Sequence, residues 1–476
     1  MSADHSQGNR ILYLAQEFSL PLLLGVVVAI AFANVSPEAY DMVVNRTYAL
    51  VLPDQPAEDP HAGTTAEPRR ESGDSENLNS DGQESKEDPS SDQEEHVDHE
   101  NGEAGHGDHG HGDHGHASGW RHYATLHFLI NDIFMVLFFG IAAKEIAESC
   151  LPGGALNPVS KAVNPLMGTL GGVLGPVGVY LLLNSMIGDA KWVNGWGIPT
   201  ATDIALAWLI ARIVFGTGHP AISFLLLLAV ADDGIGLMII AFKYPTAPPV
   251  WVNALWVIPG LLVAFGLRVK KVQAWSPYIL IGGALSWWGL CSAHLHPALA
   301  LVPIVPFLPG PAYDEGLFQD DTSTRETDTL NRFEHDLKPY VDYGLFFFAF
   351  ANAGVQFASM SNLTWIVLLS LLVGKTVGIT FFSWAATLVG FPLPDGMKMK
   401  HLLVAGVIAG LGLTVALFVA QQAFPGDSLA SFRGASKMGA LFSGGIALLA
   451  IVLGRMLGVK DGGSGTDGSG DSPTEA

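Results

Sequence analysis

The stretch Phe224-Leu-Leu-Leu-Leu-Ala-Val-Ala-Asp-Asp-Gly-Ile-Gly-Leu-Met-Ile-Ile-Ala-Phe242 places two adjacent acids inside an apolar run. At about 1.5 Å per residue, a helix of this length crosses a bilayer. One charge at the centre of a spanning helix costs about 2.5–3.5 kcal/mol on insertion scales. Ionisable groups at that depth usually belong to ion or proton paths, so Asp232 and Asp233 are the first candidate site residues. A buried pair that is satisfied by hydrogen bonds or a salt bridge is the structural alternative.

Similar apolar segments recur along this chain of 476 residues, of which 49% are hydrophobic. We therefore expect an all-α polytopic membrane protein with about twelve transmembrane helices. An N-terminal signal peptide ending at Ala33 is an alternative interpretation of the first apolar run. The expected spans are approximately 15–36, 124–148, 162–187, 196–214, 219–243, 249–268, 273–290, 292–308, 338–359, 362–389, 402–422 and 435–458.

Two segments, 52–120 and 460–476, are polar and hold few large apolar side chains. They cannot bury enough apolar surface to offset the entropy of ordering, so we predict that both are disordered. The insert carries much of the net charge of −21, which argues against nucleic acid as a partner. The expected parts of the chain are a first transmembrane helix with its flanks (1–51), the acidic insert (52–120), the transmembrane core (121–459) and the tail (460–476).

The insert ends in a histidine-rich run from His106 to His116. Imidazoles and carboxylates at this density can bind zinc, nickel or copper, but the run lacks a fixed tetrahedral spacing. A solvated spacer is the simpler interpretation, and a transition-metal/proton transporter is the alternative function. Cys150 and Cys291 give neither a metal spacing nor a disulfide framework.

Positive residues in the short loops predict the orientation of the chain in the membrane. With the N-terminus inside, the inner side carries more of them than the outer side, which predicts that both termini are cytoplasmic and that the insert faces outside. The inner residues are Lys161, Arg268, Lys270, Lys271, Arg325, Arg332, Lys398, Lys400, Arg455 and Lys460, and the outer ones are Lys191, Lys243, Arg433 and Lys437.

Two of the expected spans have interrupted sequences. In Gly195-Trp-Gly-Ile-Pro-Thr-Ala-Thr-Asp-Ile-Ala205, Pro199 removes a backbone donor and disfavours helix at the residue before it. In Ala405-Gly-Val-Ile-Ala-Gly-Leu-Gly-Leu-Thr-Val415, each glycine weakens a helix by about 1 kcal/mol relative to alanine. Interrupted spans at corresponding places in two repeats indicate a binding site in transporters. An ordinary proline kink, with Asp203 as a helix cap, is the structural alternative for the first.

A lysine lies deep inside another span, in Leu369-Ser-Leu-Leu-Val-Gly-Lys-Thr-Val-Gly378. A buried lysine needs a carboxylate partner or loses its proton. Asp232 or Asp233 is the expected partner of Lys375, and snorkelling to an interface is the alternative.

Oxygen ligands from Asp233, Asp203 and Thr202 suit a small hard cation such as Na⁺ or Li⁺. Because burial disfavours the charged form of a carboxylate, the same groups also bind protons. A second carboxylate nearby couples the two titrations. We therefore expect protons and Na⁺ to compete for one site, in a transporter that is not an enzyme and needs no cofactor.

These motifs resemble the NhaA-type sodium/proton antiporters of bacteria, from about residue 124 to 458 and in the first span. The matching stretches are Ile130-Asn-Asp132, Ile198-Pro-Thr-Ala-Thr-Asp203, Ala231-Asp-Asp233, Arg332-Phe-Glu-His335, Phe348-Ala-Phe-Ala-Asn-Ala-Gly354, Gly374-Lys375 and Gly410-Leu-Gly-Leu-Thr414. The resemblance implies inverted repeats with two crossing broken helices. It also implies a homodimer in the bacterial inner membrane.

The resemblance implies a role for each matching residue. Asp233 corresponds to the cation-binding carboxylate, Asp232 to the carboxylate that pairs with Lys375, and Thr202 and Asp203 to the pair that tunes the site. The implied activity is electrogenic exchange of cytoplasmic Na⁺ (or Li⁺) for external H⁺, activated at alkaline pH. The residues that correspond to the family's pH-sensing candidates are Glu145, Glu334, His335 and His296.

The chain departs from the family pattern in the region of the implied pH sensor. The family's Gly-Leu-Glu-Val-Lys is here Ala142-Ala-Lys-Glu-Ile146, and Lys338 stands where a histidine is usual. The acidic insert also replaces a short outer segment that is used in dimer contacts. An intramembrane aspartyl protease is disfavoured because its two acids should lie on different helices, and a passive channel needs no buried lysine–aspartate pair.

Overall fold

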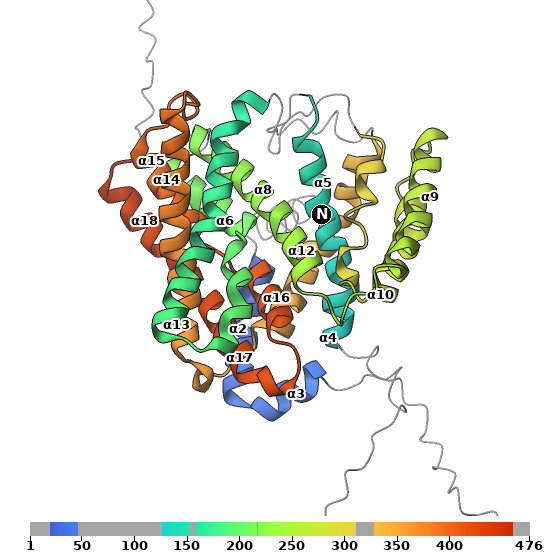
Figure 1. Ribbon diagram of the computed structural model, residues 1–476, viewed down its shortest axis with the longest axis horizontal. Coiled ribbons are helices and arrows are strands. Elements are labelled where there is room, and N and C mark those ends of the chain that lie inside the picture. Colours follow the sequence, from blue (N-terminus) through green and yellow to red (C-terminus); the bar gives the residue numbers. More distant parts are fainter. Residues whose placement is uncertain (1–19, 46–125, 153–158, 217, 311–327, 460–476) are drawn as a thin grey trace, which may run out of the picture. The chain divides into compact units, whose positions relative to one another are not determined.

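The computed structural model describes residues 20–45, 126–152, 159–216, 218–310 and 328–459, and every regular element in these ranges is helical (Figure 1). The predicted insert 52–120 and tail 460–476 lie outside the described residues, as does the start of the first predicted span.

Five helical stretches within these ranges are each long and apolar enough to cross a membrane. Four of the five stretches match predicted spans closely, and the fifth begins a few residues before its predicted span. They are Leu126–Ser149, formed by α4 (Leu126–Phe128), η2 (Leu129–Phe134) and α5 (Met135–Ser149); α6 (Val159–Ile187); α8 (Pro220–Lys243); Asn362–Leu388, formed by α13 (Asn362–Leu369), η9 (Ser370–Gly374) and α14 (Lys375–Leu388); and Ala430–Met456, formed by α17 (Ala430–Phe442), η11 (Ser443–Gly445) and α18 (Ile446–Met456).

Two further spans are broken helices, as the sequence predicts. The first joins η3 (Ala190–Thr200) to α7 (Ile204–Phe215) with a bend of 57°. The second joins α15 (Met399–Ala409) to α16 (Thr414–Ala423) with a bend of 49°. Pro199 lies one residue before the end of η3, and Gly410 and Gly412 lie within the break of the other span.

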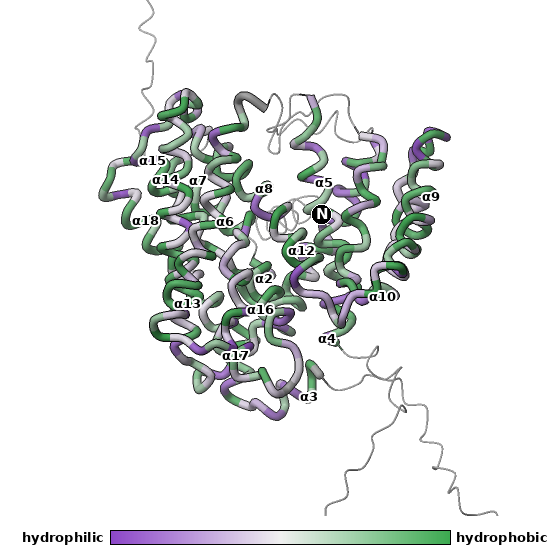
Figure 2. The backbone as a smooth tube through the Cα atoms, viewed as in Figure 1, coloured by the Kyte–Doolittle hydropathy of each residue, from purple (hydrophilic) through white to green (hydrophobic). Residues whose placement is uncertain are grey.

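Shorter apolar helices account for most of the remaining predicted spans. Figure 2 shows apolar colouring along most of α9 (Val257–Val269) and polar colouring at one end; Arg268 lies in the last turn of this helix. These helices are α2 (Leu20–Val35), η4 (Asn253–Trp256) with α9 (Val257–Val269), and η5 (Tyr278–Gly283) with α10 (Ala284–Ser292). The short helices α3 (Pro37–Asn45), η8 (Phe357–Ser359) and η10 (Asp427–Leu429) lie in connecting segments.

Two segments differ from the prediction. The predicted helix 292–308 is wrong, because this segment forms turns and two short 3₁₀ helices, η6 (Pro297–Leu299) and η7 (Val305–Phe307). Its prolines lack the N–H group that a continuous helix needs. In addition, α12 (Thr329–Ala353) begins well before residue 338, because the Asp328 carboxylate accepts hydrogen bonds from the first backbone N–H groups.

Glycines bring α6 and α14 into direct contact side by side (Figure 1). A Cβ atom on Gly171 or Gly175 would meet the backbone of Gly378 or Gly374, and the reverse is also true. Small residues at such a crossing allow the two backbones to approach closely. This packing fixes the start of α14, and therefore Lys375, against the core of the protein.

Candidate functional site

Lys375 and Asp232 form a fully buried ion pair. The Lys375 Nζ atom lies 2.6 Å from Asp232 Oδ2, and both side chains have 0% exposure. The same ammonium donates a hydrogen bond of 2.6 Å to the Thr202 hydroxyl. The structure thus brings together three of the predicted site residues, from α14, α8 and the break between η3 and α7.

Thr202 also joins the two broken helices. Its Oγ1 atom lies 3.0 Å from the Ala409 carbonyl oxygen and 3.1 Å from Asp232 Oδ2, and its single proton can be donated to either. Ala409 is the last residue of α15, whose final carbonyl groups lack partners within the helix. The hydroxyl can therefore supply one of these missing donors while it accepts from Lys375.

Asp203 caps two helices at once. Its Oδ1 atom accepts from the Leu206 N–H at 3.1 Å, at the start of α7, and its Oδ2 atom accepts from the Thr414 N–H at 3.2 Å, at the start of α16. The Asp203 N–H donates 2.7 Å to the Leu411 carbonyl inside the other break. Because helix N-termini carry partial positive charge, one carboxylate serves both ends.

Asp233 differs from these two aspartates in its surroundings. Its side chain is buried, and its Oδ1 atom has no hydrogen-bond partner among the described residues. Asp232 Oδ1 is likewise buried without a partner. Asp203 follows Thr202, whose Oγ1 atom lies 3.1 Å from Oδ2 of Asp232, the residue that precedes Asp233. Two buried carboxylate oxygens that lack donors fit a hard cation or a proton, which are the species such oxygens bind.

Two of the pH-sensing candidates belong to a cluster around a lysine that sequence reasoning missed. Lys144 has a nearly buried side chain, and it contacts Glu145 at 3.5 Å, Glu148 at 2.6 Å and, on α12, Glu334. Lys338, one turn after Glu334 on α12, has a largely exposed side chain whose Nζ atom lies 3.6 Å from the Glu334 carboxylate. A lysine followed four residues later by a glutamate, at the place where the chain departs from the family pattern, was the available signal.

The other candidates lie outside this cluster. His335 has a 78% exposed side chain and lies 3.6 Å from Asp336. His296 is buried, its ring packs on Phe418, and its Nδ1 atom accepts from the Ala298 N–H. Asp132 lies in η2, where its carbonyl accepts from the Trp287 indole N–H at 3.3 Å.

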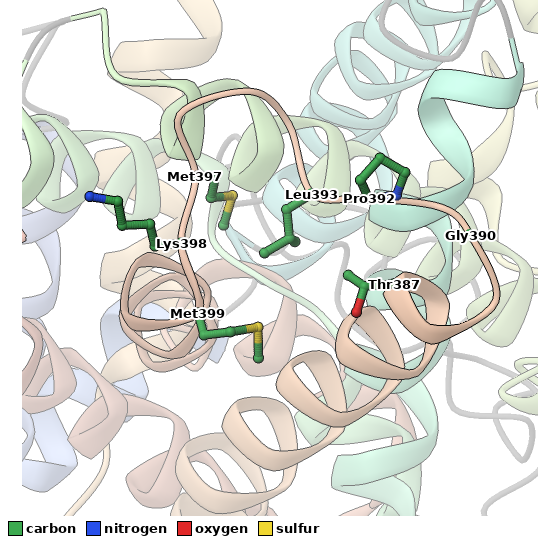
Figure 3. A pocket seen from close by; sticks show the side chains of 7 residues that line it. All are labelled: Thr387, Gly390, Pro392, Leu393, Met397, Lys398 and Met399. Carbon is green, nitrogen blue, oxygen red and sulfur yellow. The ribbon is translucent and has the colours of Figure 1, made fainter.

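A surface hollow of about 570 Å³ opens between the end of α14 and the start of α15 (Figure 3). In Figure 3 the Lys398 ammonium points away from Thr387 and Pro392. The hollow shares no lining residue with the aspartate site, so we assign it no role in binding. Its lining consists of Thr387, Gly390, Pro392, Leu393, Met397, Lys398 and Met399.

The chain is similar to one protein family and to several named proteins. The family described as Na⁺/H⁺ antiporter 1 matches residues 111–457. A Na(+)/H(+) antiporter NhaA from Desulfitobacterium hafniense is 48% identical over 460 residues, which cover 96% of this chain and 98% of that protein. One from Geobacter sulfurreducens is 57% identical over 341 residues, which cover 71% and 87%.

A solved structure of a sodium proton antiporter from Methanocaldococcus jannaschii aligns with 69% of this chain and 87% of its own, at 13% identity and a TM-score of 0.44. At that TM-score the likeness supports no conclusion. The family match and the relatives cover most of the chain, and they confirm the resemblance found in the motifs. The chain therefore belongs to the Na⁺/H⁺ antiporter 1 family.

Proposed function

We propose that this protein exchanges cytoplasmic Na⁺, or Li⁺, for external H⁺; its relatives are named Na(+)/H(+) antiporters. The observation that supports this most directly is Asp233. It is a buried carboxylate without a hydrogen-bond donor at Oδ1, and it adjoins an aspartate already paired with lysine. A site of this kind is stable only when it takes up a positive ion.

Competition for the aspartates gives the exchange its mechanism. Na⁺ binds to Asp233, with Asp232 and Asp203 close by, and Lys375 then keeps Thr202 as its acceptor. Protons that bind to the same carboxylates displace Na⁺, and Lys375 regains Asp232 once Na⁺ has left. Alternating exposure of the site, through movement of the two broken helices, carries each ion across the membrane.

The same groups support electrogenic exchange. The site holds two adjacent carboxylates that can take protons, whereas one Na⁺ carries one charge. If more than one proton enters for each Na⁺ that leaves, every cycle moves net charge. A membrane potential therefore contributes about 2.3 kcal/mol per charge per 100 mV to the exchange.

Everted membrane vesicles test the proposal. Addition of Na⁺ to respiring vesicles should dissipate the pH gradient, and Asp233→Asn should abolish this response. Asp395→Asn is the matched control, because it removes the same charge from an exposed position and should leave exchange intact. Full exchange by Asp233→Asn would overturn the proposal.

The alternative of a transition-metal/proton transporter has no support in the described ranges, which contain no group of three or more histidine, cysteine, aspartate or glutamate side chains that could hold a metal ion. The histidine-rich run His106 to His116 lies outside these ranges. A response of the vesicles to Zn²⁺ but not to Na⁺ would favour the alternative.

The carboxylates around Lys144 are suited to regulation by pH. Glu145 and Glu148 on α5 and Glu334 on α12 share one ammonium, so their charge state affects how these two helices are held together. Protonation of the carboxylates at lower pH weakens this link. We assign activation at alkaline pH to this cluster, with the exposed His335 and the buried His296 as remaining candidates.

The remaining parts of the proposal are the orientation of the chain in the membrane and its oligomeric state. Positive residues in the predicted inner loops support a cytoplasmic location for both termini in a bacterial inner membrane. A homodimer is proposed from the family resemblance alone. Cysteine crosslinking and labelling of exposed loop positions in intact cells test both features.

A further inference from the structure

The unwound segment 410–413, between α15 and α16, exposes backbone groups in a buried place. Residues of the first broken helix bind one backbone group in this segment, the Leu411 carbonyl, and two beside it, the Ala409 carbonyl and the Thr414 N–H; the partners are Thr202 and Asp203. The Gly412 N–H is different, because it donates to the hydroxyl of Ser443 at 3.2 Å. That serine belongs to neither broken helix.

Ser443 is held so that its oxygen faces this N–H group. Its hydroxyl donates 2.6 Å to the Ala440 carbonyl one turn earlier, which leaves a lone pair for the Gly412 N–H. The side chain has 0% exposure. Ser443 also begins the 3₁₀ segment η11, between α17 and α18, and short 3₁₀ stretches inside helices often occur at functional hinges.

Glycine at position 412 permits this contact. A Cβ atom there would lie 2.7 Å from the Leu371 side chain and 3.0 Å from the Ala201 carbonyl, so the segment is packed directly against the other break. A small displacement of Gly412 is therefore transmitted to its neighbours. Leu411 binds the Asp203 N–H, and Thr414 binds the Asp203 carboxylate.

We propose that Ser443 is a positioning residue for cation exchange, because its hydroxyl holds the unwound segment in the geometry in which Asp203 caps α16. The inference rests on the proposed function. It assigns the last helical span a direct part in shaping the site, through one side chain that does not touch the transported ion.

The test compares Ser443→Ala with Ser443→Thr and with Ser286→Ala in the reconstituted full-length protein. Threonine keeps the hydroxyl. Ser286 is an equally buried serine in α10 whose hydroxyl oxygen has no hydrogen-bond partner among the described residues, so its loss controls for removal of a buried hydroxyl alone. Loss of a buried hydrogen bond changes an equilibrium by about tenfold.

Ser443→Ala should raise the apparent KM for Na⁺ by about tenfold at an alkaline pH where exchange is fully active, with a smaller effect on the maximal rate. Ser443→Thr and Ser286→Ala should stay within about twofold of the unmodified protein. Hydrogen–deuterium exchange should accelerate in a peptide that covers 410–413 in Ser443→Ala but not in Ser286→Ala. This second readout needs folded protein but no transport.

Lower thermal stability of Ser443→Ala with unchanged KM and unchanged exchange at 410–413 would overturn the inference, since that result describes a packing role. Equal KM changes in Ser443→Thr and Ser443→Ala would also overturn it. An unmodified protein that fails to exchange Na⁺ for H⁺ refutes the proposed function instead, so the two failures are distinguishable.

Discussion

Replacement of Thr202 by valine tests which group accepts a hydrogen bond from Lys375 when a cation occupies the site. Valine has nearly the shape of threonine but lacks the hydroxyl. In the structure, Lys375 donates to Thr202 and to Asp232, each at 2.6 Å, and is fully buried. When a cation occupies the aspartates, Thr202 becomes the remaining acceptor of the ammonium.

The size of the effect follows from this geometry. A hydrogen bond to a charged group contributes about 1.5–3 kcal/mol. In Thr202→Val the displaced ammonium has no acceptor, so binding of any cation to the aspartates is weakened by that amount. At about 1.4 kcal/mol per factor of ten, we expect Na⁺ and H⁺ each to bind about 10- to 150-fold more weakly.

The size of the change in KM should depend on pH. At alkaline pH few protons compete, so the apparent KM for Na⁺ should rise by the full factor. At lower pH the weaker binding of protons offsets the weaker binding of Na⁺, so the difference from the unmodified protein should shrink. Initial rates of exchange in proteoliposomes, measured over Na⁺ concentration at several pH values, provide the curve.

Thr364→Val is the matched control. Thr364 is as buried as Thr202, and its hydroxyl donates 2.9 Å to the Ala435 carbonyl, but it contacts no charged side chain among the described hydrogen bonds. Both variants lose a bond to a carbonyl, and only Thr202→Val loses the bond to the ammonium. An unchanged KM at alkaline pH, or an equal rise in both variants, would refute the reasoning.

Three further predictions concern other parts of the structure. Gly172→Ala should raise the KM for Na⁺ several-fold in transport assays, because the added Cβ atom would lie 3.3 Å from Asp232 Oδ1. Gly178→Ala on the same helix is the control: its Cβ atom would meet nothing within 4 Å, so KM should stay unchanged. Lys144→Gln should lower exchange at alkaline pH and flatten its pH profile, because without the ammonium the carboxylates of α5 and α12 share no partner at any pH, and Lys338→Gln, whose side chain is 56% exposed, should change the profile less. Deletion of residues 55–115 should leave vesicle exchange intact, and loss of exchange in a well-expressed deletion would contradict the interpretation of the insert as a spacer.

The buried ion pair and the two breaks could be predicted because lipid limits the alternatives. A lysine and two aspartates at mid-membrane have few possible partners other than each other, which led from sequence to the contact between Lys375 and Asp232. Pro199 and the glycines near 410 likewise indicated the breaks, because proline removes a backbone donor and clustered glycines weaken a helix.

Contacts that depend on exact register could not be predicted. The bond from Thr414 to Asp203 joins residues 211 positions apart, and nothing local to either residue indicates it. The error at 292–308 has a different cause. Hydropathy measures whether a segment can be buried, whereas the prolines at 297, 303 and 306 decide whether it can be helical. Lys144 was overlooked because it borders an apolar run, where charged residues usually reach water.

Summation of the charges at the site identifies the residue that must change its charge during transport. The N-termini of α7 and α16 each carry roughly half a positive charge, and Asp203 offsets both by capping both. Lys375 offsets Asp232 at 2.6 Å. Asp233 is the carboxylate that remains without a compensating group, and burial makes that state costly. It must therefore hold a cation or a proton in each stable state of the site, which is the requirement for obligatory exchange. On this reasoning Asp233→Asn should bind neither ion yet fold normally, whereas Asp203→Asn should still exchange but with altered affinity, because an amide oxygen can cap one helix but not neutralise two. Loss of folding in the first variant, or wild-type affinity in the second, would show that the charges are balanced in another way.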